Sequence, residues 1–215
     1  MKKLILVLAL SAGLLASCAG DPLRQANLGV RETYRSPAFT ERYNGNALGL
    51  LTAAGGDGRQ EYKNILGEFV EEALKKERPD LKIVPYWESL SSINSKGFTP
   101  DYAEMLHAYA TTGILDRDRL KKLGIALDVR YFVQPRLINF QQRQSTRFSL
   151  LGLTLFKTHE SEIKIYLEMW DAHTGNVVWI GVAETNMASE KFMARPIPFE
   201  EVARYAIENL IKKMP

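Results

Sequence analysis

Between Glu160 and Asp171 the chain alternates polar and apolar residues. The apolar positions are Ile163, Ile165, Leu167 and Met169, and the residues between them are Glu162, Lys164, Tyr166 and Glu168. A period of two places all the apolar side chains on one face of a β-strand. The segment is therefore predicted to be a half-buried strand, so the fold must contain a sheet.

Two further strand-like segments flank this one, and helical patterns come before and after the group. The expected strands are 47–51, 81–85, 128–140, 160–171 and 176–186, and the expected helices are 60–77, 100–112, 116–123 and one that begins at Pro198. Early strands interleaved with helices and a late run of three strands are typical of an α/β fold. We expect a single sandwich domain with a mixed sheet and a C-terminal β-meander followed by a final helix.

Residues typical of helix ends set the expected boundaries. Thr99 is a suitable N-cap, and Pro100 fits the first position of the helix that follows. Gly113 is expected to end that helix, and Gly124 is expected to end the next one.

The N-terminus has the organisation of a secretory leader. Met1-Lys2-Lys3 is basic, the run from Leu4 to Leu15 is apolar, and Ala16-Ser17-Cys18 follows. The apolar run is too short for a transmembrane helix, which needs about 20 residues. A buried core helix is a weaker alternative, because the run has no polar face.

Leu15-Ala16-Ser17-Cys18 resembles a bacterial lipobox, in which the cysteine is lipidated after cleavage. Cys18 is the only cysteine, so an exported chain could form no internal disulfide, and lipidation would consume its thiol. Several acyl chains, palmitate among them, would anchor the protein stably. By resemblance to sorted lipoproteins, Ala19 after the cysteine implies the outer membrane.

This organisation predicts three parts. Residues 1–17 form the signal peptide, 18–44 form a lipidated tether with a short extended piece near Val30–Tyr34, and 45–215 form the α/β accessory domain. The formal charge is +3, and cleavage would remove Lys2 and Lys3, which leaves 26 basic residues against 25 acidic ones. A balance so close to neutral does not support nucleic-acid binding.

Three segments together resemble a family of envelope lipoproteins. They are the strand, Gly-rich loop and helix at 48–74, the segment Leu120-Lys121-Lys122-Leu123-Gly124 before the strand at Val129–Val133, and the hairpin at 170–179. The hairpin resembles the D-x-x-T-G-x-x-x-W pattern of the curli-secretion (CsgG-type) and penicillin-binding-protein-activator (LpoB-type) lipoproteins. The resemblance covers roughly residues 45–215. Leu51-Thr52-Ala53-Ala54 departs from it, because many members carry a proline and an aromatic residue there.

The hairpin motif also has a physical reading. Asp171 can accept hydrogen bonds from backbone N–H groups in the turn, and Gly175 can adopt a positive φ. Trp170 and Trp179 supply large apolar faces on paired strands. Asp171 is therefore interpreted as a turn former rather than a catalytic acid.

Candidate chemistry is sparse. Gly55-Gly56-Asp57-Gly58 matches neither the P-loop nor the dinucleotide fingerprint, so we expect a plain loop and no cofactor. His159 and His173 lie at opposite ends of one expected strand, roughly 45 Å apart, and His107 lies on a helix, which leaves little support for a metal site. No Gly-x-Ser-x-Gly elbow occurs. A set of three acidic residues on the first helix is read as a solvated face: Glu68, Glu71 and Glu72.

One expected connection is unusually apolar and basic. From Val129 to Thr158 the chain has no Asp or Glu. The candidate contact residues are Arg147, Phe148, Leu150, Leu151, Leu153, Leu155, Phe156 and Lys157. Three interpretations stay open: an extra strand or flap over the core, a loop that contacts a protein partner or the membrane surface, and half of a membrane-spanning β-hairpin.

These patterns predict a non-catalytic, lipid-anchored periplasmic accessory protein at the outer membrane. The resemblance implies a partner in envelope assembly, secretion or cell-wall synthesis, and no small-molecule substrate is evident. The alternative is a self-assembling subunit of an oligomeric secretion channel of the curli-secretion type. An envelope hydrolase is a weaker third hypothesis.

Overall fold

The computed structural model describes residues 23–37, 39, 47–55, 60–150, 153–191 and 195–215. One mixed sheet contains β1 (Leu23–Arg35), β7 (Val177–Lys191), β6 (Leu153–Asp171), β5 (Tyr131–Leu150), β2 (Ala47–Leu50) and β4 (Lys82–Ile83) in that order, and β3 (Ala54–Gly55) pairs with β5. The helices are α2 (Gln60–Glu77), α3 (Tyr86–Ser95), α4 (Thr99–Thr112), α5 (Arg117–Leu127) and α6 (Phe199–Ile211). The expected α/β domain, with its β-meander and final helix, is confirmed.

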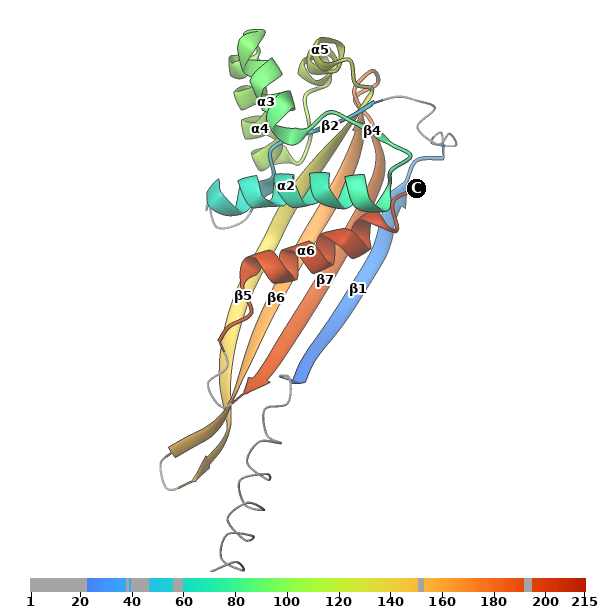
Figure 1. The fold of residues 1–215 in the computed structure, drawn as a ribbon. Coiled ribbons are helices and arrows are strands. Elements are labelled where there is room, and N and C mark those ends of the chain that lie inside the picture. Colours follow the sequence, from blue (N-terminus) through green and yellow to red (C-terminus); the bar gives the residue numbers. More distant parts are fainter. Residues whose placement is uncertain (1–22, 38, 40–46, 56–59, 151–152, 192–194) are drawn as a thin grey trace, which may run out of the picture.

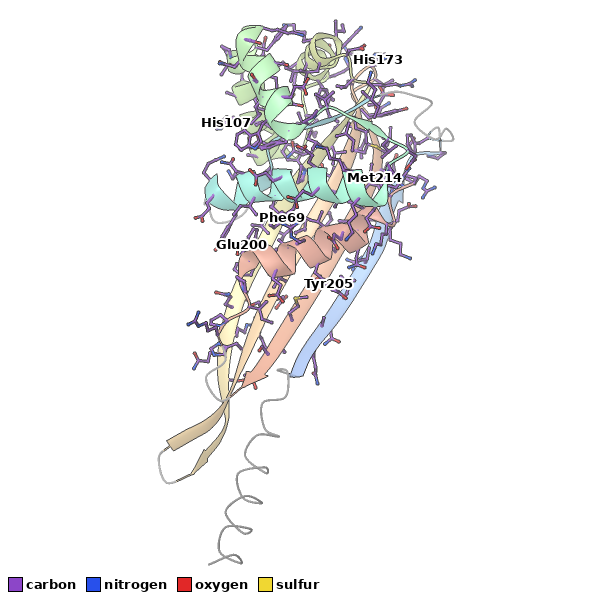
Figure 2. The ribbon with its side chains drawn as sticks, viewed as in Figure 1. Phe69, His107, His173, Glu200, Tyr205 and Met214 are labelled. Carbon is purple, nitrogen blue, oxygen red and sulfur yellow. The ribbon has the colours of Figure 1, made fainter. Side chains whose placement is uncertain are left out.

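Helices α2 and α6 cover one face of the sheet (Figure 1). The alternating residues of β6 face them, because Ile163, Ile165, Leu167 and Met169 are all buried in the same core cluster as the apolar side of α6. Figure 2 shows the side chains of this layer, with Phe69 on α2 and Tyr205 on α6. The expected half-buried strand and the helix 60–77 are therefore confirmed.

A second cluster lies on the opposite face of the sheet, at one end only. Phe132 and Trp170 are neighbours across β5 and β6 and contact side chains of α4 and α5. We call this the helical end of the sheet, and it is the end at which His173 lies (Figure 2). Trp170 belongs to this cluster and Trp179 to the first, so the two tryptophans serve opposite faces.

The predicted tether is wrong over much of its length, because Leu23–Arg35 forms β1, an edge strand of the sheet. It runs antiparallel to β7 along almost its whole length. The strand was missed because apolar alternation in this segment is limited to Ala26, Leu28 and Val30, and an edge strand keeps many polar residues. The sheet therefore includes the chain from Leu23, whereas the tether was expected to extend to residue 44.

One helix is additional to those expected, and two helix boundaries differ. Helix α3 was not predicted, and α4 begins at Thr99 with Phe98 as its N-cap residue. Gly124 lies inside α5, which ends at Asp128 in a left-handed conformation. The glycine is needed there because an added Cβ would lie 2.7 Å from the Cβ of Ala172 and 2.9 Å from the carbonyl oxygen of Val129.

The turn between β6 and β7 follows the expected pattern. The Asp171 carboxylate accepts hydrogen bonds from the backbone N–H groups of His173 (2.8 Å) and Thr174 (3.2 Å), and Gly175 has a φ of 74°. Arg130 donates to the same carboxylate at 3.3 Å. These contacts confirm Asp171 as a turn former.

Candidate interaction surfaces

The apolar segment expected as a connection is instead the far end of the β5–β6 hairpin. β5 continues to Leu150 and β6 begins at Leu153, so the interpretation as a loop is wrong. Backbone pairing joins Phe148 to Phe156 and Leu150 to Leu153. Leu151 lies outside the described residues, as does Cys18.

This part of the hairpin extends past the rest of the sheet. The residues Leu23, Glu190, Thr158 and Ser145 form a row of backbone partners across β1, β7, β6 and β5. Beyond the row, Thr146–Leu150 pairs with Leu153–Lys157, and only Lys157 has a further partner, on β7. We call these two five-residue arms the ribbon; Figure 1 shows it projecting from the sheet at the end opposite the helical end.

The geometry of the ribbon bears on the three interpretations of the apolar segment. The segment is not an extra strand or a flap over the core, because it forms the ends of β5 and β6 and its backbone continues away from the layer of α2 and α6 (Figure 1). The described residues among 148–156 are divided between two arms, whereas a membrane-spanning strand needs about 9–11 residues in each strand. The geometry therefore favours contact with a surface over a complete span.

The polar face of the sheet forms a second candidate surface. Helices α2 and α6 cover the other face, and α3–α5 contact this one only at the helical end. Glu184 on β7 accepts a hydrogen bond from Lys164 at 2.7 Å and pairs with Arg31 on β1 at 3.3 Å. The hydrogen bond from Lys164 lowers the pKa of Glu184, and the same contact raises the pKa of Lys164.

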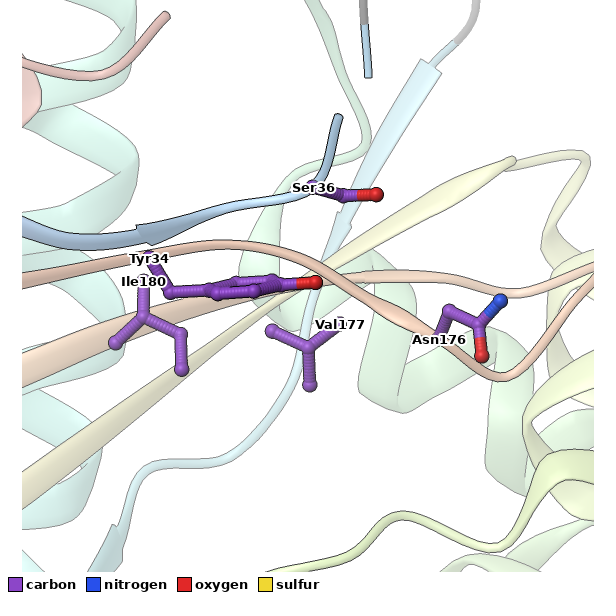
Figure 3. A pocket seen from close by; sticks show the side chains of 5 residues that line it. All are labelled: Tyr34, Ser36, Asn176, Val177 and Ile180. Atoms are coloured by element: carbon purple, nitrogen blue, oxygen red, sulfur yellow. The ribbon is translucent and has the colours of Figure 1, made fainter. Parts of the chain in front are cut away.

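Two shallow cavities open along β1 and β7. One, of about 500 Å³, is lined by Tyr34, Ser36, Asn176, Val177 and Ile180 (Figure 3). In Figure 3 the ring of Tyr34 lies beside Ile180. The second, also about 500 Å³, lies over Asn27, Glu162 and Glu184. Paired strands of the sheet contribute most of the residues that line both cavities.

A buried polar cluster lies where the polar face meets α4. The Glu168 carboxylate accepts hydrogen bonds from the Tyr109 hydroxyl (2.8 Å) and the Trp170 indole (3.3 Å), and it pairs with Arg136 at 3.2 Å. Burial, followed by the charge of Glu168, raises the pKa of Tyr109. The sequence marked Glu168 as a polar position of β6 but gave no sign that α4 would bury it.

Other titratable groups near the helices also have structural partners. Glu71 accepts the backbone N–H of Tyr86 at the start of α3 (2.7 Å), and Glu68 accepts the indole N–H of Trp87 (3.1 Å). Tyr102 bonds with Thr52, and burial raises the pKa of Tyr102 to about 12. Glu72 pairs with Arg204 on α6, so each of the three acidic residues read as a solvated face contacts a neighbouring element.

The histidines lie apart, as their spacing indicated. His159 is buried on β6, His107 is exposed on α4, and His173 is exposed in the turn at the helical end. In the described ranges, no three His, Cys, Asp or Glu side chains gather closely enough to hold a metal ion. None of the helices in the described part of the chain is long and apolar enough to span a membrane.

Comparison with solved structures gives distant likenesses. Lipoprotein GNA1162 from Neisseria meningitidis is 12% identical, with 78% of this chain and 99% of that chain covered and a TM-score of 0.46. The PelC dodecamer from Paraburkholderia phytofirmans is 13% identical over 86% of this chain and 96% of that chain, with a TM-score of 0.41. A PDZ domain protein from Parabacteroides distasonis is 9% identical over 96% of this chain and 40% of that chain, with a TM-score of 0.39.

One of these neighbours is a lipoprotein by name. No family model and no curated protein matches the chain. At such low identities and TM-scores, assignment to either lipoprotein family does not follow from these likenesses.

Proposed function

We propose that the protein is a lipid-anchored periplasmic accessory protein at the outer membrane, which binds an envelope assembly, secretion or cell-wall synthesis partner without catalysing a reaction. The observation that supports it best is the polar sheet face. Strands β1, β6 and β7 extend beyond the cover of α3–α5, two cavities open along them, and the charged side chains of Arg31, Lys164 and Glu184 are partly exposed on this face. Such a rigid, polar and partly concave surface suits a protein partner.

The lipid anchor is carried by the N-terminal sequence. Leu15-Ala16-Ser17-Cys18 provides the lipobox, and Ala19 is consistent with sorting to the outer membrane. Strand β1 begins five residues after Cys18, so an anchored protein would hold its sheet close to the bilayer.

A non-catalytic role is supported by the structural contacts of the buried carboxylates, which are the groups best suited to acid–base chemistry. Glu168 is occupied by Tyr109, Trp170 and Arg136, and Asp171 holds the β6–β7 turn. Both are engaged in the architecture rather than aimed into one of the cavities described above.

The channel alternative receives less support than the accessory role. Each arm of the ribbon has five residues beyond the row at Leu23, about half of what a membrane-spanning strand needs. The detergent-extracted lipoprotein is therefore expected to be free of large rings when its mass is measured by light scattering. A ring of many copies would favour the channel.

Radioactive palmitate labelling and membrane fractionation test the anchor. The wild-type chain should incorporate label and sediment with the outer membrane, and Cys18→Ala should do neither. A chain that stays unlabelled in the wild type would contradict the anchor.

Site-specific photocrosslinking in intact cells tests the surface. A photoreactive residue at Asn27 or Asn186, paired neighbours on the polar face, should give one discrete adduct. The matched control is Lys121, an exposed position on α5. Equal crosslinking from Lys121, or none from the sheet positions, would contradict binding through this face.

A further inference from the structure

We propose that the ribbon, Thr146–Leu150 with Leu153–Lys157, contacts the surface of the same membrane that holds Cys18, so that the domain stands on the bilayer in one orientation. This inference rests on the proposed lipid anchor. The partner of the apolar ribbon is then the surface of the lipid bilayer.

The first argument is that both features leave the same end of the sheet. Strand β1 starts at Leu23, and Leu23 is in one row with Ser145 and Thr158, from which the ribbon departs. Strand β1 runs from this row toward the helical end, so its first residue, Leu23, lies at the ribbon end of the sheet (Figure 1). An anchor at Cys18 thus pulls the ribbon end, and not the helical end, toward the membrane.

The second argument is one of reach. Five residues join Cys18 to Leu23, and at about 3.3–3.6 Å per residue they span at most about 18 Å. The ribbon has five residues in each arm beyond the row, which at about 3.3 Å each extend about 17 Å. The tip of the ribbon therefore reaches the depth at which the lipidated cysteine enters the bilayer.

The reach of the chain from Cys18 to Leu23 and the length of the ribbon also argue against a protein as the partner of the ribbon tip. A partner domain seated on the ribbon tip would have to fit between the sheet and the membrane. The chain from Cys18 to Leu23 allows a gap of at most about 18 Å, which the ribbon itself fills.

The composition of the ribbon suits a membrane interface. Its arms contain the apolar residues Phe148, Leu150, Leu153, Leu155 and Phe156. Arg147 and Lys157 stand at the base of the arms, and Lys157 pairs along the backbone with Lys191. Basic residues beside an apolar tip favour anionic headgroups.

Backbone pairing limits how deep the ribbon can go. Beyond Lys157, each described arm pairs only with the other, so each has an outer edge of backbone groups without a neighbouring strand. Unpaired backbone groups are excluded from the hydrocarbon core. The contact is therefore confined to the headgroup region, where water can satisfy those groups.

Single-cysteine labelling tests this contact, because lipidation consumes the only native cysteine. An environment-sensitive fluorophore is attached at Leu150→Cys, and at Ile125→Cys as the matched control. Ile125 is an aliphatic residue on α5 at the helical end, 69% exposed. The full mature lipoproteins are reconstituted in vesicles of phosphatidylethanolamine and phosphatidylglycerol that contain a nitroxide-labelled lipid.

The expected result is that both proteins float with the vesicles, while only the Leu150 label shifts its emission to shorter wavelength and loses fluorescence to the nitroxide. If both proteins float and the two labels behave alike, the membrane contact is overturned and the lipid anchor stands. If the wild-type protein does not float, the anchor fails and this inference fails with it. A shift at Leu150 that occurs only in native membranes, and not in protein-free vesicles, would assign the ribbon to a protein partner and overturn the proposal.

Discussion

The two ends of the β5–β6 hairpin have opposite surroundings. At the helical end, Phe132 and Trp170 are covered by α4 and α5, while Val133 and Met169, the next residue pair, are covered by the layer of α2 and α6. At the other end, the ribbon arms pair with each other beyond the last partner on β7. One pair of strands thus passes from the centre of a layered core to an isolated two-stranded ribbon.

This difference shows that apolar residues in the hairpin have two different roles, one at each end. At the helical end the apolar residues stabilise the fold, because helices cover both faces. Between the two ends, residues 141–145 are polar and exposed, yet the ribbon sequence becomes apolar again. A two-stranded hairpin is only marginally stable alone in water, so an apolar ribbon indicates contact with something outside the chain.

Phe132→Ala should produce the largest loss of stability. Phe132 is fully buried and packs closely against the backbone at Gly49, so its removal leaves a cavity. We expect the free energy of unfolding to fall by about 3–5 kcal/mol, measured by denaturant titration.

The matched substitution at the other end is Phe148→Ala. If the ribbon serves contact rather than folding, the same chemical change there should alter the free energy of unfolding by less than about 0.5 kcal/mol. Similar losses for the two variants would break the comparison between the two ends.

Glu168→Gln tests the polar part of the helical end. The carboxylate accepts hydrogen bonds from Tyr109 and Trp170 and pairs with Arg136, which is partly exposed. Hydrogen bonds to a charged group contribute about 1.5–3 kcal/mol, so we expect the free energy of unfolding to fall by about 2 kcal/mol in a denaturant titration.

Tyr109→Phe should lower the free energy of unfolding by about 1 kcal/mol alone and by less in the Glu168→Gln background. Strictly additive losses would contradict a coupled cluster of Tyr109 and Glu168.

Gly124→Ala tests how closely α5 approaches the sheet. Alanine improves helix propensity by about 1 kcal/mol, but its Cβ would meet Ala172 and the Val129 carbonyl. Overpacking of this kind costs about 1–3 kcal/mol, so we expect a net loss of about 1 kcal/mol in thermal unfolding. The exposed neighbour Ile125 provides the control: Ile125→Ala should change little, and a stabilised Gly124→Ala would show that the contact relaxes easily.

Much of the architecture could be predicted from local patterns. Helix 60–77 follows from apolar spacing, and the β6–β7 turn follows from Asp171 and Gly175. In each case the determining residues lie close together in the sequence, so their periodicity or turn chemistry is sufficient.

The missed features depend on residues far apart in the sequence. Strand β1 forms because its polar sequence pairs with β7, some 150 positions later. Position 124 requires glycine because Ala172 lies against it. The ribbon was missed because residues 141–147 lack apolar alternation, and the pairing of β5 with β6 alone makes them a strand. The sequence marks the candidate residues as unusually apolar and basic for a connection, but their arrangement as two paired arms follows only from the register.

The smallest loss of stability expected from a change in a described side-chain contact concerns Glu32, where β1 joins the core. Its carboxylate binds Arg35 and accepts the indole N–H of Trp179 at 2.9 Å, and the hydrogen bond from Arg35 is the main cause of a lowered pKa. A lowered carboxyl pKa stabilises the fold above the ordinary value of 4.5, and this contribution is lost as the pH falls through the folded-state value. Because the group is partly exposed, Glu32→Gln should cost only about 0.5 kcal/mol at neutral pH.

The measurement is the free energy of unfolding of wild type and Glu32→Gln from neutral pH to well below 4.5. The two curves should converge at acid pH, because protonated Glu32 resembles glutamine. In an Arg35→Gln background, Glu32→Gln should lose most of its effect, since the principal partner is absent. A difference in the free energy of unfolding that persists at low pH would mean that Glu32 acts through packing on Trp179 rather than through its charge. Strand β1 would then be held to the core by side-chain packing, as the helical end is.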